Sequence, residues 1–266
     1  MILLTFRAKI ALGYLRTPVV NALGWLFESR EITNFTYDLD QTNRRYLICT
    51  IADVVGVEPS VIERYVQEIE QNEELKRHVA TATADSDRGF MADPAVRFGR
   101  RIGWYAFARA MKPRIIVETG VDKGLGSCLL TAALKKNAAE GFSGRYYGTD
   151  IDPGAGYLLR GEYAEFGRIL YGDSIRSLSA LEGEVDLFIN DSDHSADYET
   201  QEYLTIGVKL SDRAIILGDN AHYTDRLLQY SLATGRHFLF FQEKPAKHWY
   251  PGGGIGISFH RSPPAR

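Results

Sequence analysis

The chain has 266 residues, which suits one large domain or a medium-sized domain with an appendage. Its composition, 45% apolar and 24% charged residues, is typical of a globular protein. The net charge of −3, without a long basic run, argues against nucleic acid as a partner.

Residues 1–30 are apolar, but four residues unsuited to lipid interrupt them: Arg7, Lys9, Arg16 and Pro18. No uninterrupted stretch reaches the roughly 20 residues of a spanning helix, and the pattern is too broken to indicate a signal peptide. Two interpretations stay open. The segment packs on the chain's own core or on a second copy in a homo-oligomer, or it lies in a membrane interface with Phe6, Trp25 and Phe27 in lipid. The expected location is the cytoplasm, in the second case at the inner face of a membrane.

Helical signals continue as far as residue 111. Asp38 and Asp40 are N-cap candidates for a helix that runs to about Val55. A second helix is predicted over 59–69, a loop over 81–94 and a third helix over 95–111. We therefore expect a helical N-terminal region over residues 1–110, serving as a cap, a dimerisation element or an interfacial segment, and a separate domain over 111–266.

From residue 113 onward the pattern alternates between short apolar runs and helical stretches. The predicted strands cover residues 115–118, 146–149, 169–171, 185–189, 214–217, 238–241 and 254–259. The predicted helices cover residues 127–137, 155–166, 175–181, 197–210 and 224–233. This alternation predicts an α/β fold with a mostly parallel sheet, whose last two strands form an antiparallel pair at one edge.

The first strand runs into a glycine-rich turn with Glu118 just before Gly120 and Gly124. Such a turn brings a ligand close to bare backbone. A dinucleotide fold places a pyrophosphate here, but a carboxylate suits a cation better. The ammonium of S-adenosylmethionine therefore fits the predicted site.

Polar residues also follow the second and third strands. Asp150 lies about 30 residues beyond the glycines, where a carboxylate accepts hydrogen bonds from ribose hydroxyls. Asp173 and Ser174 follow the third strand, at a place suited to contact adenine. Together these positions predict an adenosine site at the carboxyl edge of the sheet.

Two polar clusters, 190–195 and 218–222, follow the fourth and fifth strands. They bring carboxylates, an amide and two imidazoles to one pocket mouth. Oxygen ligands of this kind suit magnesium, manganese or calcium, although a mixed site with His also suits zinc or iron. The acids Asp191 and Asp219 have a plainer interpretation as helix caps. Similarly, Trp249 and Tyr250 either are packing residues or form a mobile lid or the wall of an acceptor pocket.

In this order the motifs resemble the class I S-adenosylmethionine-dependent methyltransferases. Within that group the last two clusters are similar to those of the metal-dependent O-methyltransferases of the catechol, caffeoyl-CoA and macrolide-sugar types. The resemblance covers residues 111–260. It implies a Rossmann-like sheet of seven strands in the order 3-2-1-4-5-7-6, and methyl transfer to a hydroxyl of a small molecule or glycan.

The resemblance also implies roles for individual residues. The expected cofactor contacts are Glu118, Thr119, Gly120, Gly124, Ser127, Asp150, Asp173, Ser174 and Asp191. The expected ligands of a divalent cation, magnesium in the first place, are Asp191, Asp219 and Asn220. His194 matches the general base, with Asp193 as its rival.

Three other functions stay open. One is a metal-dependent oxygenase of the cephalosporin-hydroxylase-like type on the same fold. Another is a nicotinamide-dependent dehydrogenase, which the acid at position 118 argues against. The third is a non-catalytic binding protein with a vestigial cofactor pocket.

Overall fold

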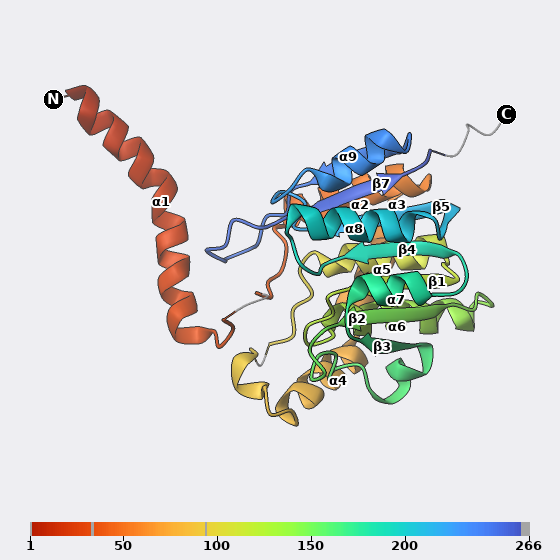
Figure 1. Cartoon of the computed structure of the whole chain (residues 1–266). Coiled ribbons are helices and arrows are strands. Elements are labelled where there is room, and N and C mark those ends of the chain that lie inside the picture. The colour runs from red at the N-terminus through yellow and green to blue at the C-terminus, as the bar shows by residue number, and fades with distance from the viewer. Residues whose placement is uncertain (1, 33–34, 94, 262–266) are drawn as a thin grey trace.

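The computed structural model of the chain describes residues 2–32, 35–93 and 95–261, and its centre is a seven-stranded sheet (Figure 1). The strand order is β3-β2-β1-β4-β5-β7-β6, as the family resemblance implies. The strands are β1 (Ile115–Thr119), β2 (Arg145–Asp150), β3 (Gly167–Tyr171), β4 (Val185–Asn190), β5 (Leu210–Asp219), β6 (His237–Phe241) and β7 (Ile255–Phe259). β1 to β5 pair in parallel, whereas β7 runs antiparallel to both β5 and β6.

Helices cover both faces of the sheet, because successive side chains of a strand point to opposite faces. In β4, Leu187 and Ile189 join the larger core, and Phe188 joins a smaller core on the other face. The larger core lies under α2 (Gln41–Val55), α3 (Pro59–Glu70), α4 (Glu73–Ala84), α5 (Arg101–Met111) and α6 (Leu125–Ala139). The smaller core lies under α7 (Ser174–Ala180), α8 (Ala196–Gly207) and α9 (Arg226–Ala233). β4 is buried along its whole length, as expected for a strand covered on both faces.

The N-terminal helices differ in part from their predicted bounds. The cap of α2 is confirmed, since the Asp40 carboxylate accepts the backbone N–H of Thr42 at 3.0 Å. The predicted loop over 81–94 is wrong at its start, because α4 continues to Ala84. Conversely, α5 starts at Arg101, six residues later than the predicted residue 95. Residues 155–166 contain only a 3-10 turn (Gly161–Phe166), and a second such turn spans Gly89–Met91.

One 27-residue helix, α1 (Ile2–Glu28), stands away from the sheet and its covering helices (Figure 1). Among the described residues, the contacts of α1 with the body of the protein include those of Asn21 and Trp25 near its C-terminal end. The indole of Trp25 packs edge-on against Phe35 and Trp249, and Asn21 donates to the backbone oxygen of His248 at 3.2 Å. Within the described part of the chain, no helix combines the length and the apolar character needed to span a bilayer.

Candidate functional site

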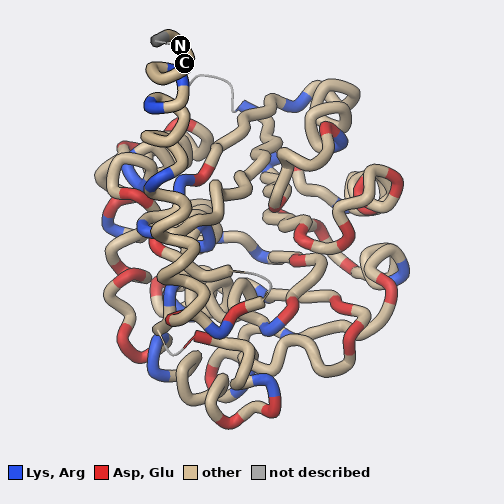
Figure 2. The backbone as a smooth tube through the Cα atoms, turned by 90° about the vertical axis from the view of Figure 1, so that its left-hand side faces the viewer, with Lys and Arg blue, Asp and Glu red and all other residues tan. Residues whose placement is uncertain are grey.

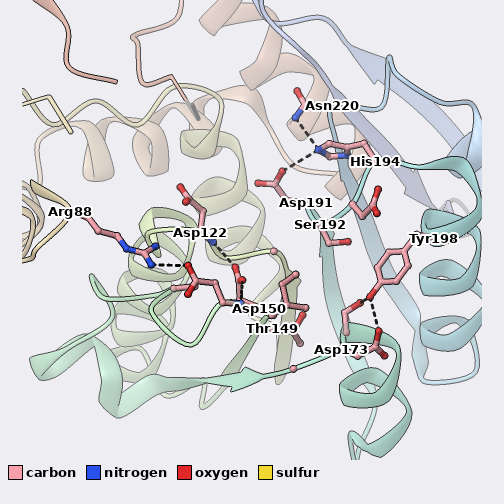
Figure 3. A pocket seen from close by; sticks show the side chains of 17 residues that line it. Arg88, Asp122, Thr149, Asp150, Asp173, Asp191, Ser192, His194, Tyr198 and Asn220 are labelled. Atoms are coloured by element: carbon pink, nitrogen blue, oxygen red, sulfur yellow. Dashed lines mark hydrogen bonds and ion pairs between the residues drawn. The ribbon is translucent and has the colours of Figure 1, made fainter. Parts of the chain in front are cut away.

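A cavity of about 730 Å³ opens at the carboxyl edge of the sheet (Figure 3). Its walls come from the segments that follow β1 to β5, as expected for an open α/β sheet. The residues from the sequence predictions that line it are Gly120, Asp150, Asp173, Ser174, Asp191, Asp193, His194 and Asn220. One cavity thus unites the predicted adenosine site with the two polar clusters.

The floor of the cavity depends on Gly120. This residue has a φ of +77°, and a Cβ atom here would lie 2.1 Å from the backbone oxygen of Asp191. Only glycine satisfies both constraints. The ends of β1 and β4 therefore approach closely enough to leave bare backbone facing the cavity.

Glu118 does not reach this cavity, which departs from the prediction that it contacts the cofactor's ammonium. Its side chain turns below the glycine-rich loop, where it accepts hydrogen bonds from Tyr146 and Ser127. Only 1% of the residue is exposed, and burial raises the pKa of Glu118 to about 7. Its position in the core makes it a support for the loop.

Three other predicted cofactor residues also lie behind the cavity wall. Thr119 donates to Glu202 at 3.2 Å, and the Ser127 and Tyr146 hydroxyls are 2.7 Å apart. Gly124 is the N-cap of α6 with a φ of +91°. These residues shape the loop from beneath, and none of them lines the cavity.

Asp150 holds the glycine-rich loop from the end of β2. One oxygen accepts the backbone N–H groups of Val121 and Asp122 at 3.1 and 3.0 Å, and the other accepts that of Asp152 at 2.9 Å. A carboxylate has about four acceptor positions, so one remains for a ligand. The side chain lies at the cavity wall between Asp122 and Thr149 (Figure 3).

Asp173 and Ser174 form the opposite side of the cavity. Asp173 caps α7 by accepting the N–H of Arg176 at 2.8 Å, and its other oxygen accepts the Tyr198 hydroxyl at 3.1 Å (Figure 3). Ser174 donates to Glu202, a buried acid on α8. Asp173 is thus both a helix cap and a cavity residue.

His194 lies at the junction of the two polar clusters. Its Nδ1 is 3.5 Å from Glu199 Oε1, an ion-pair distance without hydrogen-bond geometry. Its Nε2 is 3.4 Å from Asn220 Nδ2 and 3.9 Å from Asp191 Oδ1. With its proton on Nδ1, facing Glu199, the ring presents Nε2 as an acceptor, and the Asn220 amide N–H donates to it over a long 3.4 Å.

Asp193, the rival base, is placed differently. Its side chain accepts the backbone N–H of Ser195 at 2.7 Å just before α8, and the residue is exposed. This is the geometry of a turn residue. The arrangement therefore favours His194 as the proton acceptor.

The predicted metal ligands are not arranged as a metal site. Asp219 is 1% exposed, and both of its oxygens accept from the guanidinium of Arg100. Burial would raise the pKa of Asp219, but the charge and hydrogen bonds of Arg100 outweigh it and hold this pKa below its usual range. Asn220 turns its amide nitrogen toward Asp219, at 2.9 Å. Among the described residues, no group of three or more His, Cys, Asp or Glu side chains is placed to hold a metal ion.

Asp191 is the third predicted ligand. Its Oδ2 is 3.7 Å from Arg101 Nη2. Burial and the charge of Asp219 raise the pKa of Asp191 well above its usual range. Unlike Asp219, Asp191 lines the cavity and is open to a ligand there.

A second, smaller cavity of about 160 Å³ lies beside the first, and Asn220 lines both. Its other walls are four aromatic rings and two guanidinium groups, from Phe35, Tyr37, Tyr223, Tyr250, Arg100 and Arg101. Tyr250 therefore sits in a cavity wall, as one of its two interpretations proposed. Asn220 has a φ of +53°, an uncommon conformation that fixes its side chain between the two cavities.

Comparison with known proteins shows what part of the chain is similar to. Residues 117–221, from β1 to the turn after β5, match the model of a family described as a methyltransferase domain. This stretch of the chain is similar to a methyltransferase domain. The strand order and the position of the cavity agree with that similarity.

The same methyltransferase fold occurs in solved structures. The S-adenosylhomocysteine-bound methyltransferase PaMTH1 of Podospora anserina aligns with a TM-score of 0.51 at 16% identity, over 75% of this chain and 95% of that one. A putative O-methyltransferase from Klebsiella pneumoniae aligns at 0.53 and 14%, over 76% and 97%. The O-methyltransferase TomG of Streptomyces achromogenes, solved with S-adenosylmethionine, aligns at 0.51 and 16%, over 72% and 91%. At these identities the likeness establishes the fold. No curated protein matches the chain.

Several residues around the two cavities escaped the sequence predictions. Tyr198 and Glu202 lie on α8, one turn apart, and both point back toward the cavity edge. Arg100 and Arg101 come from a distant helix and complete the smaller cavity. An Arg-Arg pair at a helix start, next to apolar residues, was a signal in the sequence. Only the fold, however, shows which acids it meets.

Proposed function

We propose that this methyltransferase domain transfers a methyl group from S-adenosylmethionine to a hydroxyl oxygen of a small molecule or sugar. The observation that carries the proposal is the place of His194. It lies where the large cavity meets the aromatic cavity, with its Nε2 facing Asn220, which lines both. A base at that junction stands between a cofactor site and an acceptor site.

The large cavity fits the cofactor in size and in chemistry. Asp150 keeps one acceptor position for the ribose hydroxyls, and Asp173 and Ser174 lie where adenine would be met. Gly120 exposes backbone, and Asp191 offers a carboxylate to the ammonium in place of Glu118. A neighbouring ammonium would favour the charged form of Asp191. The bound cofactor supplies an electrophilic methyl group on a sulfonium.

His194 would accept the proton of the acceptor hydroxyl at Nε2. The side chain of Glu199 lies 3.5 Å from Nδ1, on the side of the ring opposite to the cavity. Glu199 is itself held in place by the hydroxyl of Thr224. Positioning the acceptor oxygen and the methyl group in line supplies much of the remaining acceleration.

The smaller cavity would hold the acceptor. Aromatic walls suit a flat ring or the apolar face of a sugar. Its volume of about 160 Å³ limits the enclosed part of the acceptor to about the size of one ring. Larger acceptors would extend past Asn220, which also lines the first cavity.

The test is transfer of a radiolabelled methyl group from S-adenosylmethionine to a panel of phenols and sugars. The panel includes matched compounds whose hydroxyl is replaced by hydrogen. We expect label in one hydroxyl class and none in its deoxy partner. Label found equally in the deoxy compounds, or in none of the panel despite cofactor binding, would contradict O-methylation.

A further inference from the structure

Two consecutive arginines pair with Asp219 and Asp191, the two acids that were predicted to bind a metal ion. Arg100 immediately precedes α5, and its guanidinium binds both oxygens of Asp219. The same group is 3.3 Å from the Tyr37 hydroxyl and 3.4 Å from Glu243 Oε1. Its side chain is 7% exposed and that of Asp219 is 0% exposed, so water screens this pair little.

Arg101 is the first residue of α5 and lies near Asp191. Its guanidinium lies over the ring of Trp104 at 5.2 Å, with Nη2 3.7 Å from Asp191 Oδ2. Its side chain is 9% exposed, and its buried Nε–H has no hydrogen-bond partner among the described residues. Since Arg101 lines the smaller cavity, an unsatisfied donor is available to a group bound there.

The two arginines already offset most of the negative charge that would attract a cation to this site. Asp191, Asp219 and Glu243 carry up to three negative charges, and the two arginines supply two positive ones. A divalent ion at Asp219 would have to displace the Arg100 fork, which would leave the buried guanidinium with only Glu243 and Tyr37 as partners. The oxygen of the Asn220 amide also lies against Gly253, where an added Cβ would be 2.2 Å away.

We infer that Arg100 and Arg101 together take the electrostatic role of a divalent cation in this site. Arg100 neutralises and holds Asp219, while the Nε–H of Arg101 donates to the acceptor oxygen. This inference rests on the proposed function. In the reaction, the acceptor O–H bond breaks and its proton passes to His194 Nε2. The oxygen then forms the new O–C bond, and the electron pair of the broken C–S bond stays on the cofactor's sulfur.

The first test needs no activity. The full chain, loaded with S-adenosylhomocysteine, is titrated with Mn²⁺, and the free ion is followed by electron paramagnetic resonance. We expect no stoichiometric binding at micromolar Mn²⁺. One tightly bound ion per chain, lost in the Asp219→Asn variant, would overturn the inference. It would also revive the metal-dependent oxygenase, which needs an ion at the same acids.

The second test concerns Arg101 and uses the acceptor found in the methyl-transfer screen, in buffer containing EDTA. We expect wild-type turnover to be unaffected by EDTA, and Arg101→Met to lower kcat about 100-fold, as loss of an oxyanion donor does. Arg101→Lys should restore part of this loss, and the pH profile of Arg101→Met should move to higher pH. Arg97→Met is the matched control, because this arginine is half-exposed and pairs only loosely with Asp38 at 3.9 Å.

Full activity of Arg101→Met, or wild-type activity abolished by EDTA and restored by Mg²⁺, would refute the arginine pair. These outcomes are separable from failure of the proposed function. A chain that binds no S-adenosylhomocysteine, or methylates nothing in the screen, refutes O-methylation, whereas the Mn²⁺ titration still reports on the acids.

Discussion

Glu118 is a buried acid whose charge the fold disfavours. Burial raises its pKa from the ordinary value of 4.5 to about 7. Between these two pH values the folded chain binds a proton that the unfolded chain releases. Stability contributed by the protonated side chain is therefore complete at low pH and is lost as the pH rises toward 7. A shift of this size corresponds to roughly 3 kcal/mol.

Replacing Glu118 by Gln should remove this pH dependence. The free energy of unfolding of the wild type should decline by roughly 2 kcal/mol relative to that of the variant between about pH 5 and pH 8. Denaturant unfolding at several pH values measures the free energy of unfolding of each protein. Parallel curves for the two proteins would show that Glu118 does not titrate in this range.

The same variant tests where the carboxylate points. Because Glu118 lies beneath the loop, Glu118→Gln should keep the Kd for S-adenosylhomocysteine within about threefold of the wild-type value. A much larger loss would mean that this acid contacts the cofactor, as the sequence first suggested.

His194 and Asp193 are adjacent but differ in surroundings, so they form a natural pair of variants. His194→Gln should lower kcat by about 10²–10⁴-fold, the usual contribution of a general base. Asp193→Asn should stay within a few-fold of wild type, since it loses only part of one exposed turn contact. Steady-state rates on the identified acceptor decide the matter. The reverse ranking would assign the proton transfer to Asp193.

At the scale of elements, Glu202 ties together three segments. Its carboxylate accepts from Thr119 at the end of β1, Ser174 at the start of α7, and Asn190 and Ser192 around the end of β4. Burial raises its pKa, and the four donors act against this effect. One side chain on α8 thus fixes the relative position of the loops that form the cavity.

Glu202→Ala should leave buried donors unpaired and destabilise the fold by about 2–4 kcal/mol. Because Ser174 and Ser192 line the cavity, we also expect roughly tenfold weaker binding of S-adenosylhomocysteine. Thermal unfolding and calorimetry measure the two effects. Gln201→Ala, on the exposed side of α8, is the control. If Glu202→Ala and Gln201→Ala had the same stability and the same affinity for S-adenosylhomocysteine, Glu202 would not hold these loops in place.

Helix α1 exposes large apolar side chains along most of its described length, among them Leu3, Phe6 and Ile10. Its basic residues are Arg7, Lys9 and Arg16, and no acid occurs before Glu28 (Figure 2). Apolar surface combined with positive charge suits an anionic bilayer. We propose that α1 lies at such a surface.

Co-sedimentation with vesicles tests this proposal. The full chain should pellet with phosphatidylglycerol vesicles, less with phosphatidylcholine, and less at high salt. A chain that begins at Ile32 should stay in the supernatant. Equal pelleting of both chains would remove the idea, and a concentration-dependent dimer formed only by the full chain would favour a second copy as the partner.

For the whole molecule, alternating patterns predicted the α/β class and the position of most strands. The reason is that buried parallel strands such as Val185–Asn190 form short apolar runs. The family resemblance, and not the pattern, implied the strand order. Glycine and acid positions after each strand located the cavity, because strand ends gather at one edge.

The remaining features depended on distant contacts. Nothing local to Asp219 shows that Arg100 lies against it, 119 residues earlier in the chain. Likewise, Glu118 follows a strand as a cavity residue would, yet Tyr146 and Ser127 draw its carboxylate into the core. Sequence position fixed which strand end carries each acid, and tertiary packing fixed which way its side chain points.

The central claim is that the cavity at the carboxyl edge of the sheet binds the nucleoside cofactor of a methyltransferase. Calorimetry with S-adenosylhomocysteine tests it most directly, using the wild type, Asp150→Ala and the exposed-site control Asp53→Ala. We expect one site per chain with a micromolar Kd in the wild type and the control, and binding at least about tenfold weaker in Asp150→Ala. No binding by the wild type, or binding that Asp150→Ala leaves unchanged, would contradict it.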